Sequence, residues 1–206
     1  MTILIAGGRG FIGKTLTENL KDYNWVIIAR SNCDSYGKNC ITEESYFNYG
    51  IDTDFDTFIL SVGSGNFKPM AEINEKDIDR AYEDNFKKPF LYLKRAMNYF
   101  ISRGTGNIIV INSISAIYPY RNGAIYGTYK SALGMLVKIL RKENENKKIK
   151  IGQIYLPPIE SPMIKKVPGI IDKGLMTSGE MLEIVNGMII KCENRDIIIK
   201  KKIEFR

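Results

Sequence analysis

The sequence of 206 residues contains no histidine. This absence excludes Ser-His-Asp hydrolases, Cys-His proteases and every metal site that depends on a histidine ligand. Cysteine is scarce as well, because Cys33, Cys40 and Cys192 are the only three and none has the paired C-x-x-C spacing of a zinc or redox site. We therefore expect reduced thiols, no disulfide and no bound metal, and acid–base chemistry has to come from side chains other than histidine.

Long apolar runs are also missing. No stretch approaches the roughly 18 apolar residues that a membrane-spanning helix needs, and residues 1–6 lack the basic start and cleavage signal of a secretory leader. We therefore expect a cytoplasmic protein without a membrane partner. The net charge of +7 is compatible with nucleic acid, with a phosphate-bearing small ligand or with solubility alone, so it does not decide between them.

Short apolar runs alternate with helical patterns along the chain. The runs are continuous, which is typical of parallel strands that are covered on both faces. Strands are expected at residues 2–6, 25–29, 57–62, 107–112, 151–156 and near 197, with a short one near Cys40. Helices are expected at 11–21, at 74–103 with a break near Lys88-Pro89, at 124–144 and at 179–190, with a short one after Thr42. This order predicts an α/β fold, a doubly wound parallel sheet (Rossmann fold), as one domain over residues 1–206, with the substrate site in segments after the strands, including 157–178.

The glycine-rich segment after the first strand has more than one interpretation. Residues 8–15 fit the phosphate loop G-x-x-x-x-G-K-[ST] of nucleotide triphosphatases, and from Gly7 onward the same stretch fits the dinucleotide-binding spacing G-x-x-G-x-x-G. A triphosphatase also needs a magnesium-holding Asp at the end of a later strand. The strands end instead in Arg30, Ser61–Gly63, Ser113 and Pro157. The dinucleotide interpretation is therefore favoured, and a glycine turn that binds nothing remains the other alternative.

The residue about 20 positions past such a loop selects the ribose. An acid there holds the 2′-hydroxyl of NAD, and a basic residue suits the 2′-phosphate of NADP. Here the position is Arg30, with Ser31 beside it, and no Asp or Glu lies between Val26 and Cys33. NADP is therefore the expected cofactor. The loop residues expected to contact it are Gly7, Arg9, Gly10, Phe11, Ile12 and Gly13.

A set of polar residues further along points to proton and hydride transfer. Tyr126 is followed by Lys130 four positions later, so both lie on one face of a helix. Ser113 ends a strand thirteen residues before Tyr126, and Asn85 lies in the helical stretch before that strand. With a glycine turn, Asn, Ser, Tyr and Lys in this order, nearly the whole chain resembles the short-chain dehydrogenase/reductase family.

The resemblance implies roles for these residues. Asn85, Ser113, Tyr126 and Lys130 would form the catalytic tetrad, with Lys130 also gripping the cofactor ribose. Gly63 follows the third long strand where the family contacts the cofactor, although Ser61–Ser64 replaces the family's Asn-Asn-Ala-Gly. Two further cofactor contacts, Pro157 and Ser161, fall where the family has Pro-Gly and a Thr against the nicotinamide amide. In this scheme Tyr126 gives its proton to a carbonyl oxygen that Ser113 holds, as NADPH supplies hydride.

An ammonium beside the phenol should make Tyr126 more acidic. Two unit charges about 4 Å apart interact by roughly 4 kcal/mol at an effective dielectric near 20, which is about three pKa units. The expected function is thus NADP(H)-dependent reduction of a carbonyl or keto group in a small, possibly sugar-linked, molecule, or the reverse alcohol oxidation. The alternatives are a sugar-nucleotide epimerase or reductase of the family's extended branch and a nonenzymatic dinucleotide sensor.

Two partner expectations complete the sequence analysis. The basic tail at residues 200–202 is expected to be a solvated strand end, with no nucleic-acid partner. The helices 85–103 and 124–140 carry apolar faces wider than one sheet covers, which predicts a homodimer or homotetramer. The side chains on these faces are Phe90, Leu93, Met97, Phe100, Leu133, Leu136 and Leu140.

Overall fold

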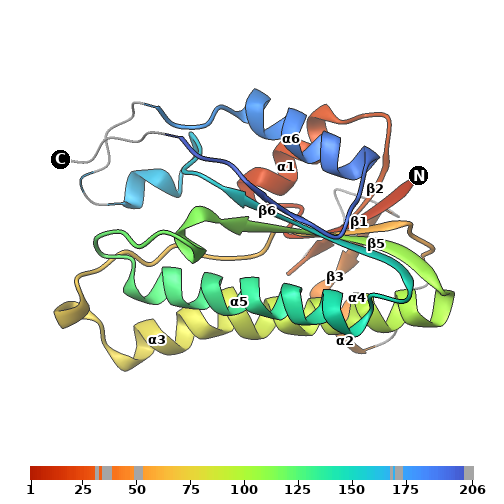
Figure 1. The fold of residues 1–206 in the computed structure, drawn as a ribbon. Coiled ribbons are helices and arrows are strands. Elements are labelled where there is room, and N and C mark those ends of the chain that lie inside the picture. The colour runs from red at the N-terminus through yellow and green to blue at the C-terminus, as the bar shows by residue number, and fades with distance from the viewer. Residues whose placement is uncertain (31–32, 34–38, 49–52, 168, 170–173, 202–206) are drawn as a thin grey trace.

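The computed structural model describes residues 1–30, 33, 39–48, 53–167, 169 and 174–201. Its strands form one parallel sheet in the order β3-β2-β1-β4-β5-β6-β7, with helices on both faces (Figure 1). The strands are β1 (Thr2–Ala6), β2 (Asn24–Ala29), β3 (Cys40–Thr42), β4 (Thr57–Leu60), β5 (Thr105–Ser113), β6 (Lys148–Leu156) and β7 (Asp196–Ile198). The main helices are α1 (Phe11–Asn19), α2 (Glu43–Asn48), α3 (Glu75–Tyr82), α4 (Lys88–Arg103), α5 (Ala124–Glu143) and α6 (Ser178–Ile190). The predicted doubly wound sheet is confirmed.

The apolar runs are continuous because the side chains on both faces of each strand pack into a core, one on either side of the sheet. Along β1, Leu4 and Ala6 face the core under α4 and α5, whereas Ile3 and Ile5 face the core under α1 and α6. Burying each of these larger aliphatic side chains stabilises the fold by about 1.5–3 kcal/mol. Among the helices in the described part of the chain, none combines the length and apolarity that crossing a bilayer requires.

The long helical region does not break at Lys88-Pro89 as expected. A π-helical turn, η3 (Glu83–Lys87), joins α3 to α4 a few residues earlier. Pro89 instead lies in the first turn of α4, directly after the π-helical turn. The extra backbone residue in the π-helical turn carries Asn85 into the protein interior, where it is fully buried.

The apolar faces of α4 and α5 are divided between core and surface. Leu93, Met97, Phe100 and Leu133 belong to the buried core, so they were wrongly assigned to an uncovered face. Leu136 and Leu140 are partly buried against the same core. Phe90 is exposed, and so are four other apolar side chains on the two helices, Leu91, Ile101, Met135 and Ile139.

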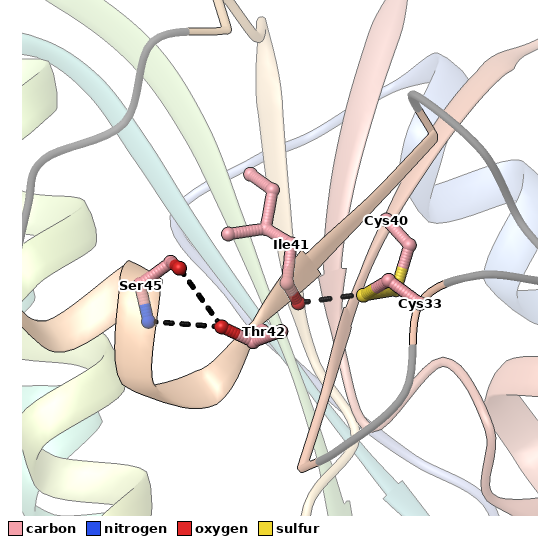
Figure 2. Close-up of a disulfide and its surroundings, with 5 residues drawn as sticks. All are labelled: Cys33, Cys40, Ile41, Thr42 and Ser45. Atoms are coloured by element: carbon pink, nitrogen blue, oxygen red, sulfur yellow. Dashed lines mark hydrogen bonds between the residues drawn. A yellow bond between two sulfur atoms is a disulfide. The ribbon is translucent and has the colours of Figure 1, made fainter.

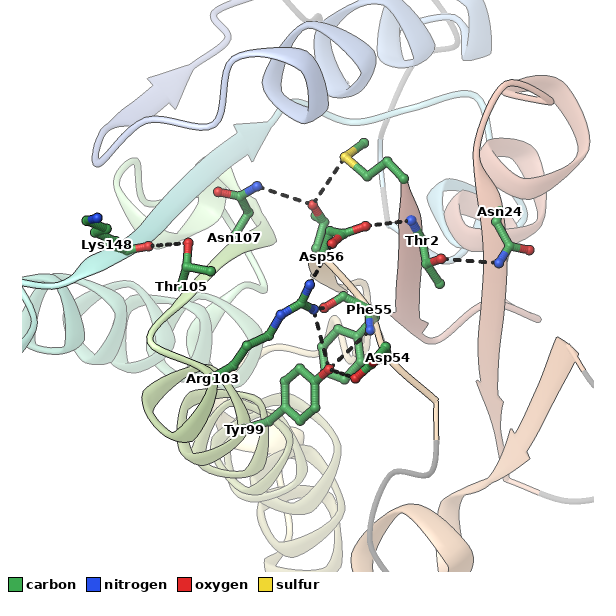
Figure 3. A network of polar contacts seen from close by, with 12 residues as sticks. Thr2, Asn24, Asp54, Phe55, Asp56, Tyr99, Arg103, Thr105, Asn107 and Lys148 are labelled. Atoms are coloured by element: carbon green, nitrogen blue, oxygen red, sulfur yellow. Dashed lines mark hydrogen bonds and ion pairs between the residues drawn. The ribbon is translucent and has the colours of Figure 1, made fainter.

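Polar contacts tie together the amino edge of the sheet (Figure 3). The Arg103 guanidinium at the end of α4 pairs with Asp56 at 3.0 Å, and Asp56 also accepts the backbone N–H of Thr2 at 2.9 Å. The Tyr99 hydroxyl donates to Asp54 at 2.9 Å. These contacts join α4 to the starts of β1 and β4, at the edge opposite the glycine turn.

The expectation of three reduced thiols is wrong for two of them. Cys33 and Cys40 form a disulfide with a Cα–Cα distance of 5.4 Å (Figure 2). Cys192 is a free cysteine. Cys40 begins β3 and pairs with Ile27 in the β2–β3 ladder. Nothing in the spacing of Cys33 and Cys40 indicates a pair.

Candidate active site

A cavity of about 370 Å³ lies at the carboxyl ends of the central strands. This edge of an open parallel sheet is where doubly wound folds bind ligands. The residues that line it come from the turn after β1, the segments after β4, β5 and β6, the start of α5 and the C-terminal tail. Of the predicted site residues, those in its lining are Gly10, Phe11, Ile12, Gly63, Ser113, Tyr126, Lys130, Pro157 and Ser161.

The glycine turn brings α1 unusually close to β1. A Cβ atom on Gly13 would lie 2.3 Å from the Gly7 carbonyl oxygen, so no other residue fits there without displacing backbone. The Lys14 ammonium pairs with Glu18 at 3.7 Å, and the Thr15 hydroxyl donates to the Phe11 carbonyl at 2.8 Å. Because this Lys and Thr are engaged along the helix surface, the triphosphatase interpretation loses support.

Three of the predicted catalytic side chains meet in the cavity. Ser113 lies at the end of β5, and Tyr126 and Lys130 lie in the first turns of α5. The Ser113 side chain hydrogen bonds with the Tyr126 phenol, and the Lys130 Nζ atom lies 5.7 Å from the centre of the Tyr126 ring. Tyr126 is 9% exposed and Lys130 is 4% exposed. A phenol, a hydroxyl and an ammonium therefore share one largely dehydrated space.

Asn85 holds in place the segment after β4, which lies next to Lys130. Its amide accepts the Ser64 backbone N–H at 3.1 Å and donates to the Ser64 carbonyl at 3.0 Å, which fixes the segment after β4. The Lys130 ammonium donates to the Val62 carbonyl at 3.4 Å. A Cβ atom on Gly63 would lie 2.8 Å from both the Asn85 oxygen and Lys130 Nζ, so glycine allows both side chains to approach.

The expected acidic phenol is not present in this structure. Burial raises the pKa of Tyr126 to about 12, and the hydrogen bond with Ser113 opposes that rise only in part. Burial also lowers the pKa of Lys130 to about 8. The prediction that Lys130 makes the phenol acidic is therefore wrong for the ligand-free chain, because burial disfavours the charged phenolate.

The comparisons with known proteins agree with this geometry. The family described as short chain dehydrogenase matches residues 47–169. The chain belongs to the short-chain dehydrogenase family. An uncharacterized oxidoreductase of Staphylococcus epidermidis is 25% identical over 152 residues, which cover 74% of this chain and 63% of that protein. The chain thus spans less than two thirds of the length of this relative.

Two other proteins extend the comparison. L-xylulose reductase of Caenorhabditis elegans is 29% identical over 173 residues, covering 74% of this chain and 69% of that protein. The alcohol dehydrogenase of Thermococcus sibiricus, solved with 5-hydroxy-NADP, superposes with a TM-score of 0.79 at 20% identity over 96% of this chain and 95% of that chain. The structural likeness supports the Rossmann fold.

Behind the site, this short-chain dehydrogenase has a chain of buried amides that the sequence analysis missed. The Asn112 amide donates to the Lys130 carbonyl at 3.1 Å and to Gln153 at 3.0 Å, and its oxygen accepts the Ser113 N–H at 2.8 Å. Gln153 in turn donates to the Tyr155 hydroxyl at 2.7 Å. These bonds tie β5 to α5 and set Ser113 against Tyr126. Their signal in the sequence is polar residues inside otherwise apolar strands.

The remaining predicted cofactor residues lie outside the cavity lining. Gly7 and Gly13 form the turn itself, and Arg9 and Arg30 are exposed after the neighbouring strands β1 and β2. Ser31 lies outside the described residues. Sequence reasoning missed several lining residues that come from loops without a recognisable motif, among them Phe67, Ser115, Tyr118, Tyr120 and Met163.

The basic tail of this family member also differs from expectation. The Lys201 ammonium donates to Glu180 at 2.6 Å and to the Leu175 carbonyl at 3.1 Å, and Lys201 lines the cavity. The Lys200 ammonium lies over the Tyr118 ring, 5.5 Å from its centre. The expectation of a solvated tail is therefore wrong for Lys201, whereas Lys200 stays exposed.

Proposed function

We propose that this chain is an NADP(H)-dependent oxidoreductase that reduces a carbonyl group of a small molecule, or oxidises the corresponding alcohol. The observation that carries the proposal is the convergence of Ser113, Tyr126 and Lys130 on one cavity beside a glycine turn. The oxidoreductase and reductase names of the two relatives support the same reaction class.

The residues around the turn fit a dinucleotide. The α1 N-terminus at Phe11 lines the cavity, and the contact between Gly13 and Gly7 leaves the backbone free to approach a phosphate. Arg9 and Arg30 place positive charge after two adjacent strands, where a 2′-phosphate fits better than a bare hydroxyl. The Thermococcus sibiricus neighbour holds an NADP derivative, in keeping with this choice. Bound NADPH would supply the hydride.

The side chains have separate roles in the proposed reaction. Because its pKa is about 12, the Tyr126 phenol keeps its proton at neutral pH and is a donor rather than a base. It gives this proton to the substrate oxygen, and the Ser113 hydroxyl holds that oxygen in place. The Lys130 ammonium is charged below pH 8 and stabilises the phenolate that remains. The protonated phenol is the form that carbonyl reduction requires, whereas alcohol oxidation would first need Tyr126 to release this proton.

The test is the loss of NADPH oxidation in Tyr126→Phe with a panel of ketones and keto-sugars. We expect a loss of at least about 100-fold, the usual contribution of a general acid, with NADPH affinity within about twofold of the parent protein by fluorescence titration. Tyr129→Phe, three residues further along α5, is the matched control and should keep its activity. A Tyr126→Phe protein that retains most of its activity contradicts the proposal. A parent protein that binds NADPH but oxidises it with no ketone points to a sensor instead.

We also propose that α4 and α5 pair with a second copy of the chain as a homodimer or homotetramer. The support is the exposed apolar group Phe90, Leu91, Ile101, Met135 and Ile139. Light scattering at micromolar concentration should give a multiple of the 23.4 kDa chain mass, and Met135→Glu should shift it toward the single chain. A parent protein that is monomeric at that concentration rules the pairing out.

A further inference from the structure

The walls of the cavity beyond the reacting hydroxyls are largely apolar. Their apolar side chains are Phe67, Ile114, Pro119, Met163, Ile164 and Val167, and their further hydroxyl groups belong to Ser115, Tyr118, Tyr120 and Ser161. None of the lining residues within the described ranges is Asp or Glu. A substrate hydroxyl placed against the apolar side chains would lose its hydrogen bonds to water without finding a partner there, which costs free energy.

The two lysines in the lining are both engaged. The Lys201 ammonium is held by Glu180 at 2.6 Å and by the Leu175 carbonyl. The Lys130 ammonium faces the Val62 carbonyl and the Tyr126 ring. An acidic substrate would have to break the Lys201 pair or compete with the proton-transfer site for its counter-ion.

An aromatic wall stands next to the proton donor. The Phe67 ring centre lies 5.4 Å from the Tyr126 ring and 6.1 Å from the Tyr120 ring. Tyr120 also lines the cavity. The space beside the reacting oxygen suits a ring or an alkyl chain.

We infer that the substrate is an uncharged ketone, or the matching alcohol, whose aryl or alkyl group packs against Phe67. Sugars, nucleotide-linked sugars and keto acids are disfavoured by the same walls. This inference rests on the proposed function, because Tyr126 and Ser113 have to hold the reacting oxygen for the Phe67 wall to meet the rest of the molecule. Each methylene buried there should raise kcat/KM about fourfold.

The experiment uses the full chain with NADPH and a series of ketones matched in size. We expect kcat/KM to rise by about three- to fourfold per carbon from 2-butanone through 2-pentanone to 2-hexanone, and to be high for acetophenone. 4-Hydroxy-2-butanone, in which a hydroxyl replaces the terminal methyl of 2-pentanone, should be at least about tenfold poorer. Higher kcat/KM for 4-hydroxy-2-butanone or for 3-oxobutanoate than for 2-pentanone overturns the inference.

Variants of the wall provide the second measurement. Phe67→Ala should lower kcat/KM for acetophenone at least tenfold and change that for 2-butanone by less than about threefold. Met70→Ala is the matched control, since Met70 lies three residues further on and is 76% exposed. If Phe67→Ala does not fold, Met163→Ala on the same cavity replaces it. Unchanged acetophenone kinetics in the wall variant overturn the inference.

Calorimetric binding of acetophenone in the presence of NADP⁺ separates the two proposals. Binding that Phe67→Ala weakens, without any reduction of the ketone, supports the apolar wall and contradicts the proposed reductase. Reduction of hydroxylated or acidic ketones in preference to acetophenone supports the proposed reductase and contradicts the apolar wall. Absence of acetophenone binding to the parent protein overturns the inference outright.

Discussion

Replacing Lys130 by methionine should stabilise the ligand-free protein. Burial lowers the pKa of this ammonium from its ordinary value of 10.5 to about 8. Each tenfold change in an ionisation constant corresponds to about 1.36 kcal/mol, so holding the charged lysine inside the fold costs about 3 kcal/mol at pH 7. Lys130→Met removes that cost and keeps most of the side-chain volume, at the expense of one long hydrogen bond to the Val62 carbonyl.

The stability gain from Lys130→Met should decrease as the pH rises. Below pH 8 the lysine is charged in both the folded and the unfolded chain, so the full cost is present. As the pH rises from 8 to 10.5 the folded protein releases its proton before the unfolded chain does, and the cost disappears. The gain from Lys130→Met should therefore fall from about 3 kcal/mol at pH 7 to about 1 kcal/mol at pH 10.

Urea unfolding at the two pH values measures this gain. Lys142→Met is the matched control on the same helix, because the Lys142 side chain is 79% exposed and pairs with the exposed Glu145. Its free energy of unfolding should stay within about 1 kcal/mol of the parent value at both pH values. A Lys130→Met protein that is less stable than the parent at pH 7, or whose gain is the same at pH 7 and pH 10, refutes the buried-charge argument.

Two further predictions concern the cofactor and the disulfide. Arg30→Glu should lower kcat/KM for NADPH relative to NADH at least tenfold, because a carboxylate repels the 2′-phosphate and suits a 2′-hydroxyl. An unchanged NADPH-to-NADH ratio would remove Arg30 from the cofactor site. Thiol titration of the denatured, unreduced chain should find one reactive cysteine, Cys192, and three after reduction. Three thiols without reductant would contradict the Cys33–Cys40 bond.

Most of the sheet was predictable because its strands are buried on both faces. The expected strand at 2–6 matches β1 (Thr2–Ala6), and the one at 107–112 lies inside β5 (Thr105–Ser113). The expected strand at 151–156 begins three residues late, since β6 (Lys148–Leu156) starts with alternating exposed and buried residues. A strand start that reaches solvent does not show the continuous apolar run on which the prediction depends.

The site was predictable only where spacing fixes geometry. Tyr126 and Lys130 lie on one helix face whatever surrounds them, so their meeting followed from the sequence. The raised phenol pKa depends on burial, which no local pattern records. Phe67 and Tyr120 reach the cavity from irregular segments after β4 and β5, and their positions follow from the folded chain alone. The pairing of Cys33 with Cys40 likewise follows from the folded chain and not from a local pattern.

The π-helical turn at Glu83–Lys87 makes chain length critical at this point. Deleting one residue there would allow an ordinary α-helical path, and each residue of such a helix turns the chain by about 100°. Asn85 would then swing away from Ser64, or α3 would rotate relative to α4. Substitutions in this turn do not change the rotation of α3 relative to α4. A single-residue deletion, in contrast, separates Asn85 from the segment after β4 that it holds in place.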